Sequence, residues 1–196
     1  MILWKTIDIA DNERALLFRR SRLERILEPG RYRTHVLGGD VRLEKYNITD
    51  VVFDNAQAKF LLNTHGQALE NHLESFEMAD NQLGLFYRDG HLVDILVPGS
   101  FLAVWKGVER IKVDVVDITD EYSIDEKLVG LLGRGLKIGK SRNLVAAVSY
   151  AEIPDEHVGL LTVNGKLEKI LQPGSYGYWK FNRAINVKLL DLRLHA

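Results

Sequence analysis

Short apolar runs separated by turn residues dominate this chain. Three compact clusters, Ala15–Phe18, Gly84–Tyr87 and Gly159–Thr162, are each followed by a stretch in which apolar and polar residues alternate. Alternation with a period of two is typical of strands that bury one face. The pattern predicts an α+β fold that is β-dominated and antiparallel. The closing strands are expected over residues 41–49, 111–119 and 185–193, and a slip in the alternation of the second predicts a β-bulge there.

The pattern occurs three times along the chain. Pro-Gly pairs stand at Pro29-Gly30, Pro98-Gly99 and Pro173-Gly174, and an aspartate stands 18 positions before each proline. The spacings agree up to Pro-Gly and differ by one residue after it. Self-similarity at a fixed spacing is the signature of a repeated structural unit. We therefore expect three homologous β-units of about 40 residues, none of which could bury its apolar face alone.

Each β-unit contains two turn signals. Asp89-Gly90 and Asn164-Gly165 lie between apolar runs, where a two-residue hairpin loop needs positive φ at both positions. Proline fixes φ at one position and glycine supplies positive φ at the next, so each Pro-Gly pair predicts a type II turn. The first β-unit has Arg20-Ser21 at the hairpin position and no Trp-Lys pair later on, so we expect a distorted end unit.

Two connecting segments have helical character. Residues 54–75 carry apolar residues with Gly66 as a break, which predicts two short helices. Residues 123–145 open with Ser123-Ile-Asp-Glu126, a capping-box pattern, and continue into a glycine-rich stretch that predicts a poorly defined second helix. The predicted segments are 1–54 (first β-unit), 55–122 (connector and second β-unit) and 123–196 (connector and third β-unit).

Composition narrows the possible functions. The 196 residues carry 26 Lys+Arg against 27 Asp+Glu, a formal net charge of −1, whereas a general nucleic-acid binder needs a basic surface. We therefore expect no nucleic-acid partner. The lack of cysteine excludes disulfides, thiolate nucleophiles and Cys-ligated zinc. Charges interrupt the apolar runs, so we expect neither a signal peptide nor a transmembrane segment.

Motifs for catalysis are weak. No two of the six histidines stand four residues apart, the spacing that places two imidazoles on one helix face. Gly133–Ser141 looks like a phosphate-binding loop, but Arg134 stands where the motif needs glycine. Gly174-Ser-Tyr-Gly177 is one residue short of a nucleophile elbow and lies in a repeated turn. We therefore expect no catalytic residue, no metal site and no cofactor.

Charged and aromatic residues indicate interaction surfaces instead. Seven arginines and two glutamates fall within residues 14–33, and the interaction residues predicted from this cluster are Arg19, Arg20, Arg22 and Arg25. A basic face suits anionic lipid head groups or an acidic partner, although solvated hairpin surface is the plainer interpretation. Trp105 and Trp179 occupy equivalent positions in the second and third β-units. They predict either core packing, which we favour, or a ligand cleft between β-units.

The third β-unit carries a family resemblance. Its motifs are Ile153-Pro-Asp-Glu-His-Val-Gly-Leu-Leu161, Asn164-Gly165, Leu171-Gln-Pro-Gly-Ser-Tyr176, Tyr178-Trp-Lys-Phe181 and Val187-Lys-Leu-Leu-Asp-Leu-Arg193. In this order they resemble the opening of bacterial slipins, which are stomatin-like members of the SPFH (band 7, prohibitin-homology) superfamily. The first two β-units resemble the extension that some bacterial slipins carry ahead of that domain.

The resemblance implies a non-enzymatic scaffold that associates with membranes and organises partner proteins. It implies a cytoplasmic location, at the periphery of the inner membrane, with other proteins, further copies of the chain or an anionic lipid surface as partners. In the family, the Leu192-Arg193-Leu194 region is followed by the rest of the band 7 domain and a coiled coil. We therefore expect this chain to be the front of a longer protein. The alternative is a stand-alone module that binds a small molecule or a peptide.

Overall fold

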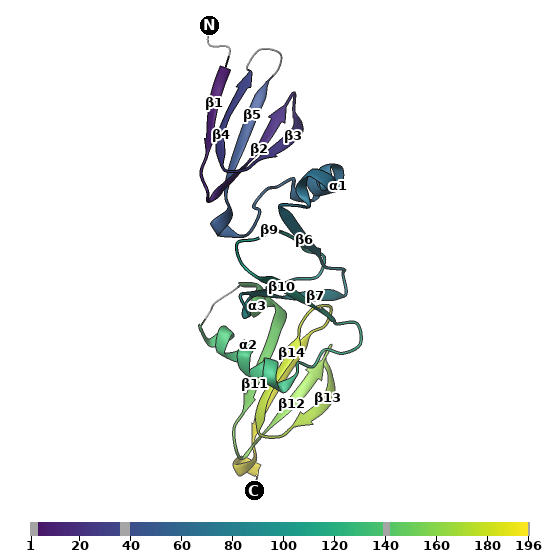
Figure 1. Cartoon of the computed structure of the whole chain (residues 1–196). Coiled ribbons are helices and arrows are strands. Elements are labelled where there is room, and N and C mark those ends of the chain that lie inside the picture. Colours follow the sequence, from purple (N-terminus) through teal and green to yellow (C-terminus); the bar gives the residue numbers. More distant parts are fainter. Residues whose placement is uncertain (1–3, 36–39, 139–141, 196) are drawn as a thin grey trace. The chain divides into compact units, whose positions relative to one another are not determined.

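Antiparallel β-sheets dominate the computed structural model, which describes residues 4–35, 40–138 and 142–195 (Figure 1). The chain divides into two compact parts, called lobes below. The first lobe comprises Met1–Glu77 and Phe101–Arg110, and the second comprises Met78–Ser100 and Ile111–Ala196. The β-dominated class is confirmed. The division between lobes falls inside the predicted segment 55–122, and the boundaries of the three β-units stay a prediction.

The first lobe is built around one three-stranded sheet. Its strands, in spatial order, are β3 (Arg22–Leu27), β2 (Glu13–Arg19) and β5 (Val41–Asn47), which η1 (Ile48–Asp50) follows. One face packs on the ribbon formed by β1 (Trp4–Ile9) and β4 (Gly30–His35). The other face packs on α1 (Ala58–Leu69) and on the ribbon formed by β6 (Leu73–Glu77) and β9 (Phe101–Trp105). The sheet is therefore covered on both faces.

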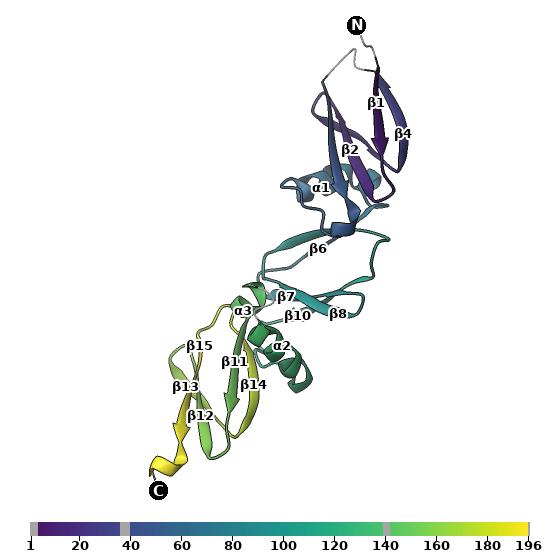
Figure 2. The same cartoon turned by 90° about the vertical axis from the view of Figure 1, so that its left-hand side faces the viewer.

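The second lobe contains two three-stranded sheets. The first has the order β10 (Ile111–Asp117), β7 (Gln82–Arg88), β8 (His91–Leu96), and the second has the order β13 (Lys166–Leu171), β12 (His157–Val163), β15 (Ile185–Asp191), which η2 (Leu192–His195) follows. The lobe also contains α2 (Glu126–Ile138), α3 (Arg142–Ala147) and the ribbon of β11 (Val148–Ile153) and β14 (Gly174–Trp179). Figures 1 and 2 both place α2 beside β11 and β14.

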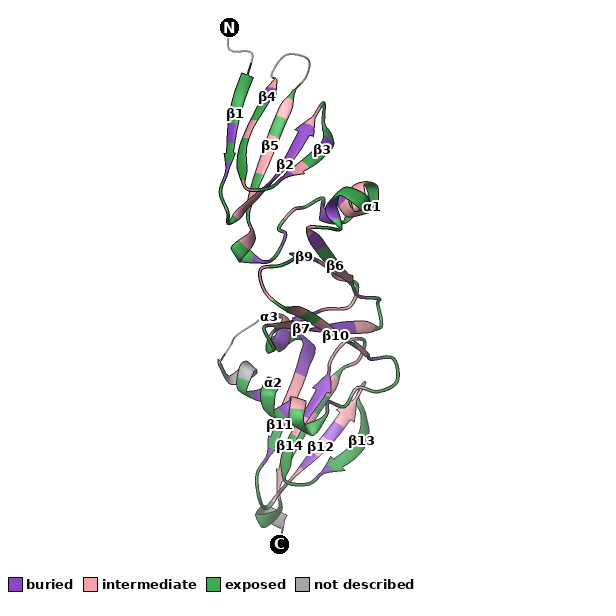
Figure 3. Cartoon of the chain, in the orientation of Figure 1, coloured by how far each residue is buried: buried purple, intermediate pink, exposed green. Residues whose placement is uncertain are grey.

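Cover on both faces explains the compact apolar clusters. In β2, Ala15 and Leu17 face the β1–β4 ribbon, while Leu16 and Phe18 face α1 and the β6–β9 ribbon. All four side chains are buried, so the central strand shows no polar alternate positions (Figure 3). The closing strand β10 likewise carries apolar residues toward both faces, which produces the slip in its alternation. It pairs with β7 without a register shift, so the bulge predicted there is wrong.

The hairpin turns form as predicted at two positions and, against expectation, at the third. Asp89-Gly90 (φ 47° and 82°) and Asn164-Gly165 (φ 50° and 80°) have positive φ at both central residues. Arg20 (φ 52°) and Ser21 (φ 62°) adopt the same conformation without a glycine. The distortion expected for the first β-unit is therefore not seen at this hairpin, because the flanking strands pair from Arg19 to Arg22 and impose the two-residue loop.

The Pro-Gly pairs adopt two different conformations. Around Pro98-Gly99 the Ser100 amide donates to the Val97 carbonyl at 3.1 Å, and Gly99 has φ 72°, as a type II turn requires. Gly30 (φ 145°) and Gly174 (φ 148°) instead begin β4 and β14 directly. The type II prediction is therefore wrong for Pro29-Gly30 and for Pro173-Gly174. The extra turn residue in the second copy accounts for the one-residue offset that follows Pro-Gly in the sequence.

The helices agree with prediction except at one cap. The first connector is α1, which consists of two helical segments joined by a kink at His65 (φ −125°, ψ 28°), next to the break predicted at Gly66. The second connector contains α2 and α3. Asp125, rather than Ser123, caps α2, since its Oδ1 accepts from the Lys127 amide at 3.0 Å. Of the phosphate-loop lookalike, residues 133–138 belong to α2 and 139–141 lie outside the described residues.

Candidate interaction site

The predicted arginines lie together on the β2–β3 hairpin, but they are not equivalent. Arg19 Nε donates to Glu24 Oε2 at 2.7 Å, and its Nη2 donates to Thr34 Oγ1 at 3.3 Å. The guanidinium carbon of Arg25 lies 5.8 Å from the centre of the Tyr32 ring. Arg20 is a turn residue, and Arg20, Arg22 and Arg25 are exposed. Arg19 thus holds its own hairpin together, whereas the others present charge to solvent.

The two predicted tryptophans lie in separate hydrophobic cores. Trp105 packs with α1 and the first sheet, while Trp179 packs with α2, α3 and the sheet of β7, β8 and β10. Each is 2% exposed, so neither indole contacts solvent. The lysine after each one donates to a main-chain oxygen of the preceding connector, Lys106 Nζ to Glu70 O at 2.6 Å and Lys180 Nζ to Val145 O at 2.8 Å. This burial agrees with core packing and speaks against a ligand cleft at the tryptophans.

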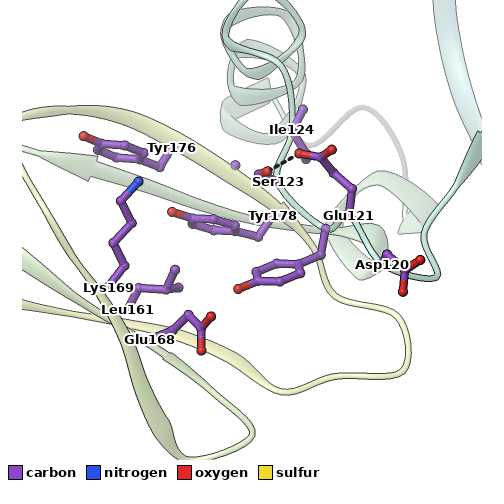
Figure 4. Close-up of a pocket in the computed structure, with 11 residues that line it drawn as sticks. Asp120, Glu121, Ser123, Ile124, Leu161, Glu168, Lys169, Tyr176 and Tyr178 are labelled. Atoms are coloured by element: carbon purple, nitrogen blue, oxygen red, sulfur yellow. Dashed lines mark hydrogen bonds between the residues drawn. The ribbon is translucent and has the colours of Figure 1, made fainter.

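A cavity of about 510 Å³ opens in the second lobe, where sequence reasoning predicted no site. Its lining combines Tyr122, Tyr176 and Tyr178 with Leu161 and Ile124. Figure 4 shows the rings of Tyr176 and Tyr178 with their hydroxyl groups pointing to the same side, and Tyr122 belongs to the same lining. Aromatic and aliphatic walls with a few polar groups are typical of sites that bind another molecule.

The backbone fixes two walls of this cavity. Residues 120–124 run beside β14, where the Ile124 amide donates to the Gly177 carbonyl and the Trp179 amide donates to the Tyr122 carbonyl, at 2.9 and 2.8 Å. Gly177 permits this approach, since an added Cβ would lie 3.2 Å from Ile124 Cδ1. The opposite wall is β13, whose pairing with β12 shifts register between Leu161 and Thr162. The shift brings two consecutive β13 residues, Glu168 and Lys169, to the lining.

Cation and hydrogen-bond contacts hold the tyrosines in place. The guanidinium carbon of Arg183 lies 4.7 Å from the centre of the Tyr122 ring, and its Nη2 donates to the Ile118 and Thr119 carbonyls at 3.0 Å. The Tyr176 hydroxyl donates to the Gln172 carbonyl at 3.1 Å. Burial raises the pKa of Tyr178 to about 12, and its two tyrosine neighbours add to the shift. The Tyr178 hydroxyl is therefore protonated at neutral pH and suits hydrogen bonding rather than base catalysis.

The charged residues at the cavity are mainly acidic. Asp120, Glu121 and Glu168 stand against Lys169, which gives a formal net charge of −2. Ser123 Oγ donates to Glu121 Oε1 at 2.9 Å (Figure 4), so the only serine of the lining is held by a carboxylate rather than a histidine. The run of five carboxylates without a basic residue over 117–126, interrupted by Tyr122, was the sequence signal that could have indicated this site.

The described part of the chain contains no group of three or more His, Asp or Glu side chains arranged to hold a metal ion. Among the same residues, no helix has both the length and the apolar character to cross a membrane. No protein-family model matches the chain, and no curated protein matches it.

Proposed function

We propose that this chain is a non-enzymatic interaction region of a slipin-like scaffold, and that the tyrosine-lined cavity binds an extended basic segment of a partner protein. The observation that carries the proposal is the position of the cavity, which joins an aromatic, acidic lining to the edge strand β13. The slipin assignment rests on the motifs of the third β-unit and on the order of the three units.

The architecture supports descent from one repeated β-unit. The chain contains three two-stranded ribbons (β1–β4, β6–β9, β11–β14) and three three-stranded sheets. Each sheet has the first strand of a hairpin at its centre, and the same register shift occurs in each hairpin. One side-chain cap also recurs: Asn47, Asp117 and Asp191 each accept a bond from the amide two residues later, at 3.1, 2.8 and 2.9 Å. Unrelated segments would have no reason to share such details.

An edge strand beside a cavity is suited to strand addition. Among the described strands, β13 pairs with β12 alone, so its outer main-chain groups face away from the sheet. An extended peptide can hydrogen-bond to such an edge while alternate side chains enter adjoining pockets. Here an apolar or aromatic side chain would enter between the tyrosines, and basic side chains would meet Asp120, Glu121 and Glu168.

Binding of a synthetic peptide tests this function. The probe is a panel of extended peptides that alternate lysine with valine or tyrosine, measured by isothermal titration calorimetry. We expect binding that Glu121→Lys/Glu168→Lys weakens at least tenfold, while Lys169→Gln binds as well or better. The matched control replaces lysine by glutamate in the peptides, which should abolish binding. Equal affinity for both panels, or no binding of either, would refute the proposed site.

A second candidate, contact with an anionic lipid surface, is favoured by the exposed charge of the first lobe. Arg20, Arg22, Arg25, Arg31 and Arg33 are all exposed. Each basic residue near an anionic surface contributes about 1 kcal/mol. The test is co-sedimentation with phosphatidylserine-containing vesicles. Arg22→Glu/Arg33→Glu should release the protein while the fold stays intact, whereas Arg19 is left unchanged because it holds Glu24 and Thr34. Binding that the double variant retains would remove the lipid surface as a partner.

A further inference from the structure

The three sheets share one apolar face that is independent of the tyrosine-lined cavity. Six equivalent positions form this face in each sheet. Two lie on the central strand (its fourth and sixth residues), and two lie on the second strand of the hairpin (its second and fifth residues). The last two are the sixth residue of the closing strand and the residue that follows this strand. In the sheet of β2 these are Leu16, Phe18, Leu23, Ile26, Tyr46 and Ile48. In the sheet of β7 they are Leu85, Tyr87, Leu92, Ile95, Val116 and Ile118. In the sheet of β12 they are Leu160, Thr162, Leu167, Ile170, Leu190 and Leu192.

The first two of these faces are covered in the same way. All six side chains of the first face belong to a core with α1 and the β6–β9 ribbon. All six of the second belong to a core with α2, α3 and the β11–β14 ribbon. In both cases a cross-strand pair at the end of the ribbon contributes, Leu73 with Trp105 and Val148 with Trp179.

The third face has no cover among the described residues. None of its six side chains is buried, and Leu167, Ile170 and Leu192 are 60%, 54% and 50% exposed. Figure 3 shows β13 largely exposed where β2 is largely buried. Five of the six residues are nevertheless aliphatic, compared with four at the first covered face and five at the second. Apolar side chains that gather on one exposed face mark a contact surface.

Among the described residues, one ribbon has the matching surface uncovered. In the β1–β4 ribbon, Ile7 and Ile9 face their own sheet, so Trp4, Thr6 and the cross-strand His35 lie on the opposite side. Trp4 pairs with His35 at the same ribbon position as the covering pairs, Leu73 with Trp105 and Val148 with Trp179. The ring centres of Trp4 and His35 are 4.8 Å apart, and the Trp4 side chain is 55% exposed.

The sizes of the two open surfaces are complementary. The covered faces have a large aromatic residue at the sixth position of the central strand, Phe18 or Tyr87, and a smaller Leu73 or Val148 on the covering ribbon. The open face has the small Thr162, and the open ribbon has the large Trp4. We propose that the β1–β4 ribbon of a second copy of this chain covers the face formed by Leu160, Thr162, Leu167, Ile170, Leu190 and Leu192, and so continues an arrangement that each chain already contains twice.

The proposed contact is head-to-tail, so it joins two different surfaces. Among the described residues, such a contact leaves one ribbon and one face uncovered on every open assembly, which allows chains longer than a dimer unless a ring closes. The pairing also predicts which residues meet, Trp4 and Thr6 of one copy with Thr162 and Ile170 of the other.

Cysteine cross-linking tests the contact directly, because the chain has no cysteine of its own. Thr6→Cys and Ile170→Cys are prepared separately, mixed, and treated with a short bismaleimide. We expect a cross-linked product of twice 22.3 kDa in the mixture and little in either variant alone. Phe60→Cys, at an exposed helix position, replaces Thr6→Cys in the control mixture and should give no product. Equal yields in the control, or cross-linking of Ile170→Cys with itself only, would overturn the proposal.

Mass measurement of the cysteine-free chain by light scattering provides the second test. We expect a mass that rises with protein concentration, and at least a tenfold weaker association for Ile170→Asp and for Trp4→Ala. Circular dichroism verifies that both variants fold, as their exposure predicts. A monomer at all concentrations overturns the proposal. Loss of association with Ile170→Asp but not with Trp4→Ala also overturns it, because another surface would then cover the face.

Discussion

The sheet of β2 in the first lobe and the sheet of β12 in the second have the same strand order, register and hairpin bulge, but different surroundings. The first is covered on both faces, whereas the second is covered on the face toward β11 and β14. Strand pairing is therefore independent of cover on the second face. The comparison separates the contacts that the sheet needs for its strands to pair from the contacts that bury its second face.

Truncating the same leucine in both sheets should give the largest difference. Leu16 is fully buried and Leu160 is only partly buried. We expect Leu16→Ala to lower the free energy of unfolding by about 3 kcal/mol, because it leaves a cavity, and Leu160→Ala by about 1 kcal/mol. Urea unfolding followed by circular dichroism measures both changes. The protein is kept dilute, so that self-association does not cover Leu160. Equal losses of unfolding free energy in the two variants would mean that the face of Leu160 is covered in solution.

Exchanging the small residue of the central strands tests the packing of the covered face. Ala15 is fully buried in β2, whereas the third position of β12 is Gly159, where a Cβ would lie 2.7 Å from Ile153 Cδ1 and 3.1 Å from Val187 Cγ1. Gly159→Ala should therefore cost about 1–3 kcal/mol through overpacking. Ala15→Gly should cost about 0.5–1 kcal/mol through backbone entropy. A stabilising Gly159→Ala, seen in urea unfolding, would mean that this glycine serves no packing purpose.

The two hairpin turns allow a smaller exchange. Ser21 and Gly165 occupy the second turn position with φ of 62° and 80°. Glycine adopts positive φ without steric cost, so Ser21→Gly should stabilise the first lobe by about 0.5–1 kcal/mol and Gly165→Ser should destabilise the second by a similar amount. Thermal unfolding followed by circular dichroism gives the sign of each change. Destabilisation by Ser21→Gly would indicate that the serine side chain contributes a contact that outweighs the strain.

The comparison also explains how much of the molecule could be predicted from the sequence. Strands and hairpins were predictable because the period of two and the Asp-Gly and Asn-Gly pairs act locally. The Arg20-Ser21 turn was not, because strand pairing rather than residue preference imposes it. The two geometries of Pro-Gly depend on how the next strand pairs, which no short motif encodes. The tyrosine-lined cavity was missed because Tyr122 and Tyr178 meet only through the pairing of residues 120–124 with β14.

The closing strands end in caps that differ in charge, which predicts a difference in response to acid. Asn47 caps the first, and Asp191 caps the third. Hydrogen bonds from Arg193 hold the pKa of Asp191 well below its ordinary value. A carboxyl with a lowered folded-state pKa stabilises the fold above its unfolded pKa of about 4 and loses that contribution as pH falls further.

Asp191→Asn should therefore make the urea midpoint of the second lobe less sensitive to acid between about pH 5 and pH 2. Asn47→Asp should make the urea midpoint of the first lobe more sensitive to acid. The new carboxylate would accept the same hydrogen bond from the Thr49 amide, and protonation would weaken that bond. Parallel pH profiles for Asp191→Asn and the unaltered chain would contradict the assignment, and would mean that Arg193 adds nothing to the cap in solution.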